Sequence, residues 1–196
     1  MTTKEKLFEA ALNLFSEKGF AATSVDEIAE SIGIKGPNLY KYYKGKDALF
    51  EAIASKNESE YDKAMSLTEE ASLNVHTAEE LKAFSMKQIS YTMPNDHVRK
   101  MRKMCNIEQF RNEHTRNKLT EHEIDTPKRQ FASIFDTMVK EGTLEPCNTE
   151  LLAFEYIAPI SLLIRKADRE PSLYEECYKE AEAYIDFFIS THFTKT

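Results

Sequence analysis

The chain has 196 residues, which suits one domain or two small ones, and its 33 acidic and 26 basic residues give a formal net charge of −7. This balance excludes a wholly basic nucleic-acid coat protein, although it is compatible with a local basic patch. Leu, Ile, Val and Phe make up about 22% of the residues, just enough for a packed core. Because Glu is abundant while Val and Gly are scarce, the composition predicts an all-α fold.

The first 46 residues carry the signals of three short helices. Apolar residues at helical spacing fill the segment Leu7–Phe15, and Gly19 suits the end of that helix. The segment Ser24–Glu27 matches a capping box that opens a second helix, which Gly33 ends. A third helix is expected to begin at Gly36-Pro37, because proline fits the first helical position.

Longer helices are expected in the rest of the chain. Asp47 is the expected N-cap of the first of them. The region 113–126 is polar and poorly periodic, and predicts either a short helix or a loop. The pattern of apolar residues and breaks predicts helices near residues 47–66, 77–93, 96–112, 127–141, 149–168 and 172–193.

The cysteines and the N-terminus bear on compartment. Cys105, Cys147 and Cys177 are odd in number, far apart and without the spacing of a zinc site, so we expect reduced thiols, no metal and no cofactor. The N-terminal segment is amphipathic rather than continuously apolar, and the most apolar stretch, 156–164, is too short to cross a bilayer as a helix. We therefore expect a cytoplasmic protein that has no membrane partner.

Two helices joined by a tight turn at Gly33 predict a helix-turn-helix. Residues 1–50 are neutral overall, yet residues 35–46 hold four lysines and no acid, and interleave them with Asn38 and three tyrosines. Such a basic helix suits the major groove of DNA, because lysines meet phosphates and Asn can bond bidentately to adenine. A solvated lysine face on an ordinary three-helix cluster would explain the charge equally well.

Three stretches, 8–15, 19–29 and 33–50, are similar to the TetR family of bacterial transcriptional regulators, and the similarity runs without a gap through residues 7–50. Its most distinctive part is Leu39-Tyr40 followed by Tyr42-Tyr43-Lys44 and Lys46. The resemblance implies an all-α dimer with an N-terminal three-helix DNA-binding domain, residues 1–46. It also implies a larger helical domain, residues 47–196, that holds an effector pocket and the dimer interface.

Carried over residue by residue, the resemblance makes 36–43 the recognition helix. Leu39 and Tyr43 are then expected in the core, and a helix cap alone explains Ser24 equally well. Because Asp26 and Glu27 place acid on the second helix, we expect base reading to rest on the third. The expected DNA-binding residues are Thr23, Ser24, Lys35, Gly36, Pro37, Asn38, Tyr40, Lys41, Tyr42 and Lys46.

Helix faces beyond residue 77 combine soft apolar side chains with a few hydrogen-bonding groups, which suits a ligand cavity, although plain core packing explains any single residue as well. The candidate pocket residues are Phe84, Ser85, Gln88, Thr92, Met101, Met104, Cys105, Phe131, Phe135 and Met138.

The last two expected helices, 149–168 and 172–193, are apolar on more than one side and need cover, which a two-fold four-helix bundle would supply. The candidate dimer-interface residues are Leu163, Ile164, Ala181, Tyr184, Ile185 and Phe188.

The leading functional hypothesis is a dimeric repressor that a small, largely apolar effector releases from a palindromic operator in double-stranded DNA. An activator or architectural DNA-binding protein without an effector is the alternative within regulation. An all-α enzyme or sequestering protein with a vestigial helix-turn-helix is the alternative outside it. Against an enzyme, the sequence shows no nucleophile–base set and no phosphate-cradling glycine loop.

Overall fold

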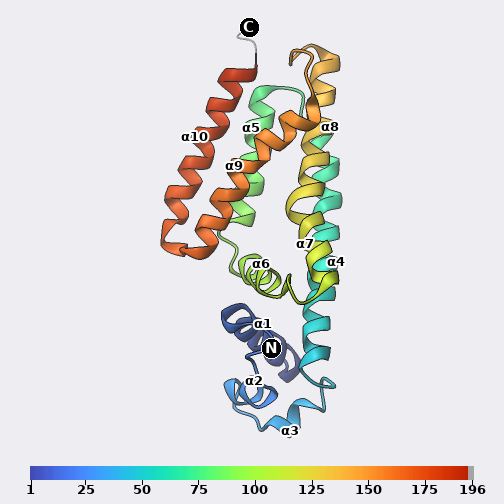
Figure 1. The fold of residues 1–196 in the computed structure, drawn as a ribbon, viewed down its shortest axis with the longest axis vertical. Coiled ribbons are helices and arrows are strands. Elements are labelled where there is room, and N and C mark those ends of the chain that lie inside the picture. Colours follow the sequence, from blue (N-terminus) through green and yellow to red (C-terminus); the bar gives the residue numbers. More distant parts are fainter. Residues whose placement is uncertain (194–196) are drawn as a thin grey trace. The chain divides into compact units, whose positions relative to one another are not determined.

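The computed structural model describes residues 1–193, except for the side chains of residues 57, 58, 61, 62 and 65–67. This part of the chain contains helices and no strand, as the composition predicts (Figure 1). The α-helices are α1 (Thr3–Lys18), α2 (Val25–Ser31), α3 (Gly36–Leu39), α4 (Lys46–Ser72), α5 (Ala78–Thr92), α6 (Asp96–Glu108), α7 (Glu113–Thr120), α8 (Thr126–Glu141), α9 (Thr149–Arg169) and α10 (Tyr174–His192). A π-helical turn, η1 (Glu121–Asp125), joins α7 to α8, and a 3₁₀ turn, η2 (Pro171–Leu173), precedes α10.

The local signals near the N-terminus are confirmed. The Ser24 hydroxyl accepts a hydrogen bond from the backbone N–H of Glu27, and the Glu27 carboxylate accepts one from the backbone N–H of Ser24, which completes the capping box of α2. Gly19 follows α1 with φ +83°, and Gly33 follows α2 with φ +77°. Both values lie in the left-handed region that glycine adopts without a steric penalty, so these glycines allow the chain to leave each helix sharply.

Several element boundaries differ from the expectation, and α6 ends at Glu108 instead of residue 112. The third helix is only Gly36–Leu39, followed by a turn, and is therefore shorter than 36–43. Helix α4 begins at Lys46, so Asp47 lies in its first turn instead of capping it, and it continues past residue 66 to Ser72. Region 113–126 is helical. Its π turn precedes Pro127, which has no N–H to donate to the carbonyl four residues earlier.

The described residues pack in two units. Unit 1 contains residues 1–65 and 96–117, and unit 2 contains residues 66–95 and the described residues from 118 onward. This division differs from the expected domain boundary after residue 46, because the start of α4 and the whole of α6 pack with the N-terminal helices. Local sequence patterns did not reveal that α6 belongs to this unit.

The core of unit 1 lies among α1, α2, α3, α6 and the beginning of α4. Phe15, Phe20 and Phe50 pack against one another with ring centroids 5.4–6.0 Å apart. Helix α6 lies against α1 (Figure 1) and buries Met101 and Met104 in the same cluster. Unit 1 thus contains the helix-turn-helix of α2 and α3, together with α1, which is covered by a helix from much later in the chain.

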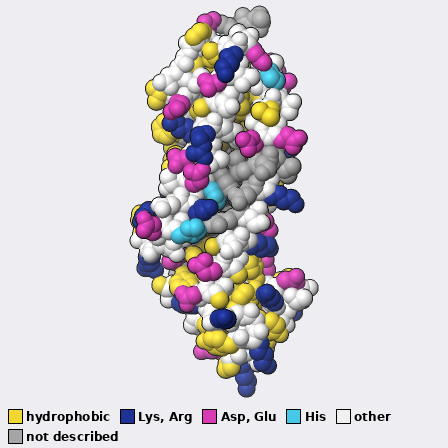
Figure 2. All heavy atoms as spheres, turned by 90° about the vertical axis from the view of Figure 1, so that its right-hand side faces the viewer, with side chains coloured by type: hydrophobic (Ala, Val, Ile, Leu, Met, Phe, Trp, Pro, Cys, Tyr) yellow, Lys and Arg dark blue, Asp and Glu magenta, His cyan; other side chains and the backbone are white. Residues whose placement is uncertain are grey.

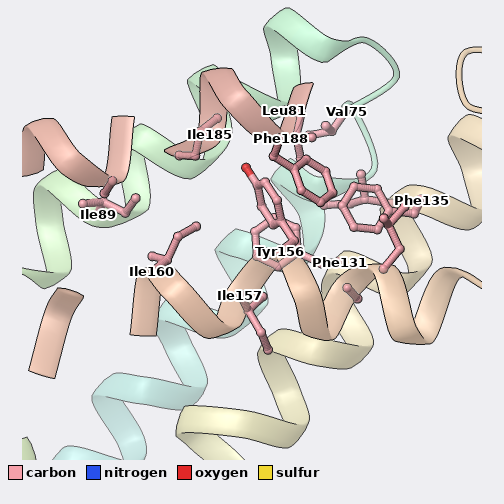
Figure 3. Packing of buried hydrophobic residues seen from close by; sticks show 14 of the residues in the cluster. Val75, Leu81, Ile89, Phe131, Phe135, Tyr156, Ile157, Ile160, Ile185 and Phe188 are labelled. Atoms are coloured by element: carbon pink, nitrogen blue, oxygen red, sulfur yellow. The ribbon is translucent and has the colours of Figure 1, made fainter. Parts of the chain in front are cut away.

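The core of unit 2 is built around the buried ring of Tyr156 on α9 (Figure 3). Its centroid lies 4.6 Å from that of Phe188 on α10, and 4.9 and 5.6 Å from those of Phe131 and Phe135 on α8. The Tyr156 hydroxyl lies 2.7 Å from the Ser85 hydroxyl of α5, so the buried polar end is satisfied. Burial raises the pKa of this phenol, which therefore stays neutral.

None of the described helices is long and apolar enough to span a membrane.

Candidate nucleic-acid interface

Helices α2 and α3 approach each other closely because Gly36 has no side chain. A Cβ atom at Gly36 would lie 1.8 Å from Oδ1 and 3.0 Å from Cγ of Asp26, so the Asp26 carboxylate occupies the space above this glycine. Gly36 itself is buried. At the predicted interface, Gly36 therefore allows the two helices to approach closely. Asp26, the acid on α2 noted in the sequence, lies beside the start of α3.

The turn around α3 exposes a group of basic and aromatic side chains. Tyr40 and Tyr42 are 59% and 41% exposed. Tyrosines are usually more buried than this, so both side chains can contact a binding partner such as DNA. Asn38 is half-buried. Basic side chains lie at the end of unit 1 that carries α2 and α3 (Figure 2). The other exposed residues of this group are Ser24, Lys35, Pro37, Lys41 and Lys44.

An open hollow of about 520 Å³ lies beside these residues. One wall is the segment 21–25, which leads into α2, and the other is the segment 44–47 at the start of α4, with Tyr40 beside them. Lys44 and the backbone at the beginning of α2 therefore share one depression. Lys44 suits an anionic group such as a phosphate of the DNA backbone, although the acidic Asp47 also lines this hollow.

Thr23 and Lys46 are used inside unit 1 instead of facing outward freely. The Thr23 hydroxyl is buried and donates to the carbonyl of Gly19 at 2.8 Å, so it is not available to phosphate. The Lys46 ammonium donates to the carbonyls of Phe20 and Thr23, both at 2.9 Å, and lies 4.3 Å above the Phe20 ring. Lys46 therefore holds the turn between α1 and α2, a role that its position in the sequence did not indicate.

The same turn is held by two carboxylates. Glu27 on α2 pairs with Lys18 at the end of α1, and this hydrogen bond holds the pKa of the Glu27 carboxyl below its usual value. Glu108, the last residue of α6, is 4% exposed, and its Oε1 accepts the backbone N–H of Phe20 at 2.9 Å. Sequence analysis missed Glu108, because nothing local distinguishes a buried glutamate from the other glutamates of the chain.

The predicted pocket residues are divided between the two units. Met101 and Met104 are buried in the core of unit 1, and Cys105 packs against it. The remaining candidates, Phe84, Ser85, Gln88, Thr92, Phe131, Phe135 and Met138, lie on α5 and α8 in unit 2. Helix periodicity could not show this, because it identifies the apolar face of α6 but not the helix on which that face packs.

Two amide groups of unit 2 lack hydrogen-bond partners in the described part of the chain. The Nε2 atoms of Gln88 on α5 and Gln130 on α8 are buried, and neither donates to another group. Their neighbours Phe84 and Phe131 stack edge to face with centroids 6.0 Å apart. Buried amides usually have partners, so these donors are places where a bound polar group or a water molecule would be stabilised. Gln130 was not among the candidates.

The predicted interface residues of α9 and α10 point into unit 2. Ala181, Ile185 and Phe188 are at most 1% exposed and Leu163 is buried, while Ile164 and Tyr184 pack against the same core. Side chains that fill the subunit core cannot also form the surface that meets a partner, which corrects the assignment of the four buried residues, whereas Ile164 and Tyr184 are partly exposed. The exposed large apolar side chains of the two helices are instead Leu151, Phe154, Leu162 and Phe187.

Comparison with known proteins identifies the helix-turn-helix. Residues 7–53 match the family model described as "Bacterial regulatory proteins, tetR family". The chain is 39% identical over 77 residues to "Probable HTH-type transcriptional regulator YttP" of Bacillus subtilis, a match that covers 39% of this chain and 36% of YttP. The N-terminal part of the chain is thus similar to regulators of the TetR family. A second relative, the "Biofilm operon icaADBC HTH-type negative transcriptional regulator IcaR" of Staphylococcus aureus, is 42% identical over 48 residues, which are 24% of this chain and 26% of IcaR.

The TetR-like fold extends over the whole chain. The ketosteroid transcriptional regulator KstR2 of Mycobacterium tuberculosis superposes with a TM-score of 0.72 at 15% identity, covering 99% of this chain and 96% of KstR2. SmeT, the repressor of the Stenotrophomonas maltophilia multidrug efflux pump SmeDEF, superposes with a TM-score of 0.66 at 20% identity. This match covers 100% of this chain and 92% of SmeT. At these identities the likeness to the solved structures shows the fold. The matches with YttP and IcaR span only about a third or less of the length of those relatives.

Proposed function

We propose that this chain is a dimeric transcriptional repressor that binds a palindromic operator through α2 and α3 and leaves it when a small, largely apolar effector binds unit 2. The observation that carries the proposal is the exposed group around α3. Two tyrosines and three lysines surround the turn, the segment 35–46 contains no acid, and Lys44 lines the hollow beside it.

A homodimer would place two such groups on one duplex. Leu151, Phe154 and Leu162 recur along one side of α9, and these side chains and Phe187 of α10 are the exposed apolar groups that a second copy would bury. A two-fold axis through such an interface matches a palindromic site, because each half of the operator then meets the same side chains.

The relatives support a repressor with an effector. IcaR is named a negative regulator, SmeT is named a repressor, and one solved structure is a complex of SmeT with triclosan. For this chain we place the effector in unit 2, beside the unpartnered amides of Gln88 and Gln130 and the aromatic pair Phe84 and Phe131. An effector that is apolar but carries a hydrogen-bond acceptor fits these groups best.

Binding to DNA tests the proposal directly. Lys41→Ala removes an exposed lysine next to α3, whereas Lys179→Ala removes an exposed lysine of α10 and is the matched control. We expect Lys41→Ala to weaken binding to specific and random duplexes alike and to reduce the slope of log K against log salt by about one. Fluorescence anisotropy over a range of salt concentrations measures both quantities. Equal behaviour of the two variants would remove the α3 surface from DNA binding.

A further inference from the structure

The turn between α1 and α2 is held from two sides by side chains of opposite charge. On one side, Lys46 of α4 donates to the carbonyls of Phe20 and Thr23. On the other side, the carboxylate of Glu108 accepts the N–H of Phe20 at 2.9 Å. The backbone of Phe20 is thus bonded through both its N–H and its C=O. This turn leads into Ser24 and forms one wall of the hollow at the candidate interface.

The carboxylate of Glu108 lies deep in unit 1, with 4% of the residue exposed. A buried carboxylate is unfavourable unless hydrogen bonds compensate for lost water, so its position depends on the bond to Phe20. Gly19 makes the approach of α6 possible. A Cβ atom there would lie 2.9 Å from Cγ2 of Ile107 and 3.2 Å from Oε1 of Glu108. The glycine at the end of α1 and the glutamate at the end of α6 therefore fit each other.

We propose that Glu108 is a positioning residue for DNA binding, which sets the conformation of the α1–α2 turn without contacting DNA. This inference rests on the proposed function. Without the carboxylate, the N–H of Phe20 loses its acceptor, and the turn keeps only its contacts with Lys46, the Thr23 hydroxyl and the Glu27–Lys18 pair. The entry to α2 and the wall of the hollow then sample other positions, and operator affinity falls because the bound conformation is less populated.

Three substitutions in the full-length chain separate positioning from general stability. Glu108→Gln keeps an oxygen acceptor at nearly the same place, Glu108→Asp keeps the charge but is one methylene too short, and Glu108→Ala removes both. Glu113→Ala is the control, because this glutamate is exposed and lies at the start of α7. Amide hydrogen exchange of Phe20, measured by NMR without DNA, reports the turn, and anisotropy with an operator duplex reports affinity.

In the Glu108→Ala and Glu108→Asp variants we expect the amide hydrogen of Phe20 to exchange at least about tenfold faster. These variants should bind the operator about tenfold more weakly, while the slope of log K against log salt stays unchanged. Glu108→Gln should keep most of the Phe20 protection and most of the affinity, and Glu113→Ala should behave as the unsubstituted chain. If Glu108→Ala does not fold, the contrast between the Gln and Asp variants still decides the question.

Two results would overturn the inference. One is wild-type operator affinity in a folded Glu108→Asp variant, and the other is equal loss of affinity in the Gln and Asp variants. Failure of the proposed function looks different, because the unsubstituted chain would then select no duplex sequence, whatever the exchange rate of Phe20.

Discussion

Two residues of α10 that are close in sequence should respond in opposite ways to the same substitution. Ile185 is 0% exposed in the core of unit 2, whereas Phe187 is 65% exposed and is one of the apolar groups that we assign to the dimer interface. We expect Ile185→Asp to unfold unit 2 and Phe187→Asp to give a folded monomer. This pair distinguishes packing within a subunit from packing between subunits.

The magnitudes follow from burial. Truncating a buried isoleucine costs about 2–5 kcal/mol, and placing a carboxylate in the vacated core adds several kcal/mol more, unless the group takes up a proton. The total for Ile185→Asp is therefore of the order of a whole domain's stability, about 5–15 kcal/mol. At the exposed Phe187 position the same carboxylate remains in water, so the intrinsic stability of the monomer should change by only about 0.5 kcal/mol.

Circular dichroism melts and light scattering after size-exclusion chromatography measure the two effects. The unsubstituted chain should be a dimer at micromolar concentration and should melt at a temperature that rises with concentration, because association stabilises the folded state. Phe187→Asp should keep the helical spectrum and lose the concentration dependence. A folded, monomeric Ile185→Asp together with a dimeric Phe187→Asp would refute the reasoning.

Other predictions concern unit 1 and pH. Gly36→Ala should destabilise the protein by about 1 kcal/mol in urea unfolding, because its Cβ would meet the Asp26 carboxylate, and Asp26→Ala in the same chain should remove most of this loss. Asn38→Ala should cost on the order of 1–3 kcal/mol on the preferred operator and little on random duplexes in anisotropy titrations; equal losses would exclude base reading by Asn38. The hydrogen bond to Glu141 raises the pKa of His76, so its stabilising effect is complete below the unfolded pKa of about 6.5 and is lost as pH rises through the higher folded value. The melting temperature of His76→Gln should therefore fall below that of the unsubstituted chain at about pH 5.5 and match it at about pH 9, and a gap independent of pH would contradict this assignment.

The sequence predicted those features that depend on neighbouring residues. The capping box at Ser24, the glycines that follow α1 and α2, and the exposed lysines near α3 all follow from spacings of a few residues. The similarity to the TetR family adds the arrangement of the helix-turn-helix. These signals act within one or two helical turns, so no knowledge of the rest of the fold is needed to interpret them.

Features that depend on distant parts of the chain were not predictable. Helix α9 has apolar residues on several sides, and only the packing shows that Leu163 faces the core while Leu162 faces outward. Met101 and Met104 lie on an apolar face of α6 that the sequence pattern indicates, but the pattern does not show that α1 packs against this face. Glu108 is identified only by its bond to Phe20, which is 88 residues away in the chain.

Selection of sequences from a pool of random duplexes tests the central claim most directly. The unsubstituted chain should enrich a palindrome whose half-sites lie about 34–36 Å apart, or a multiple of that distance, on one face of the duplex. Anisotropy in the presence of competitor DNA should then show at least about 10³-fold tighter binding to this palindrome than to random sequence. Enrichment of no sequence, with equal affinity for all duplexes, would contradict the account of this chain as an operator-binding repressor.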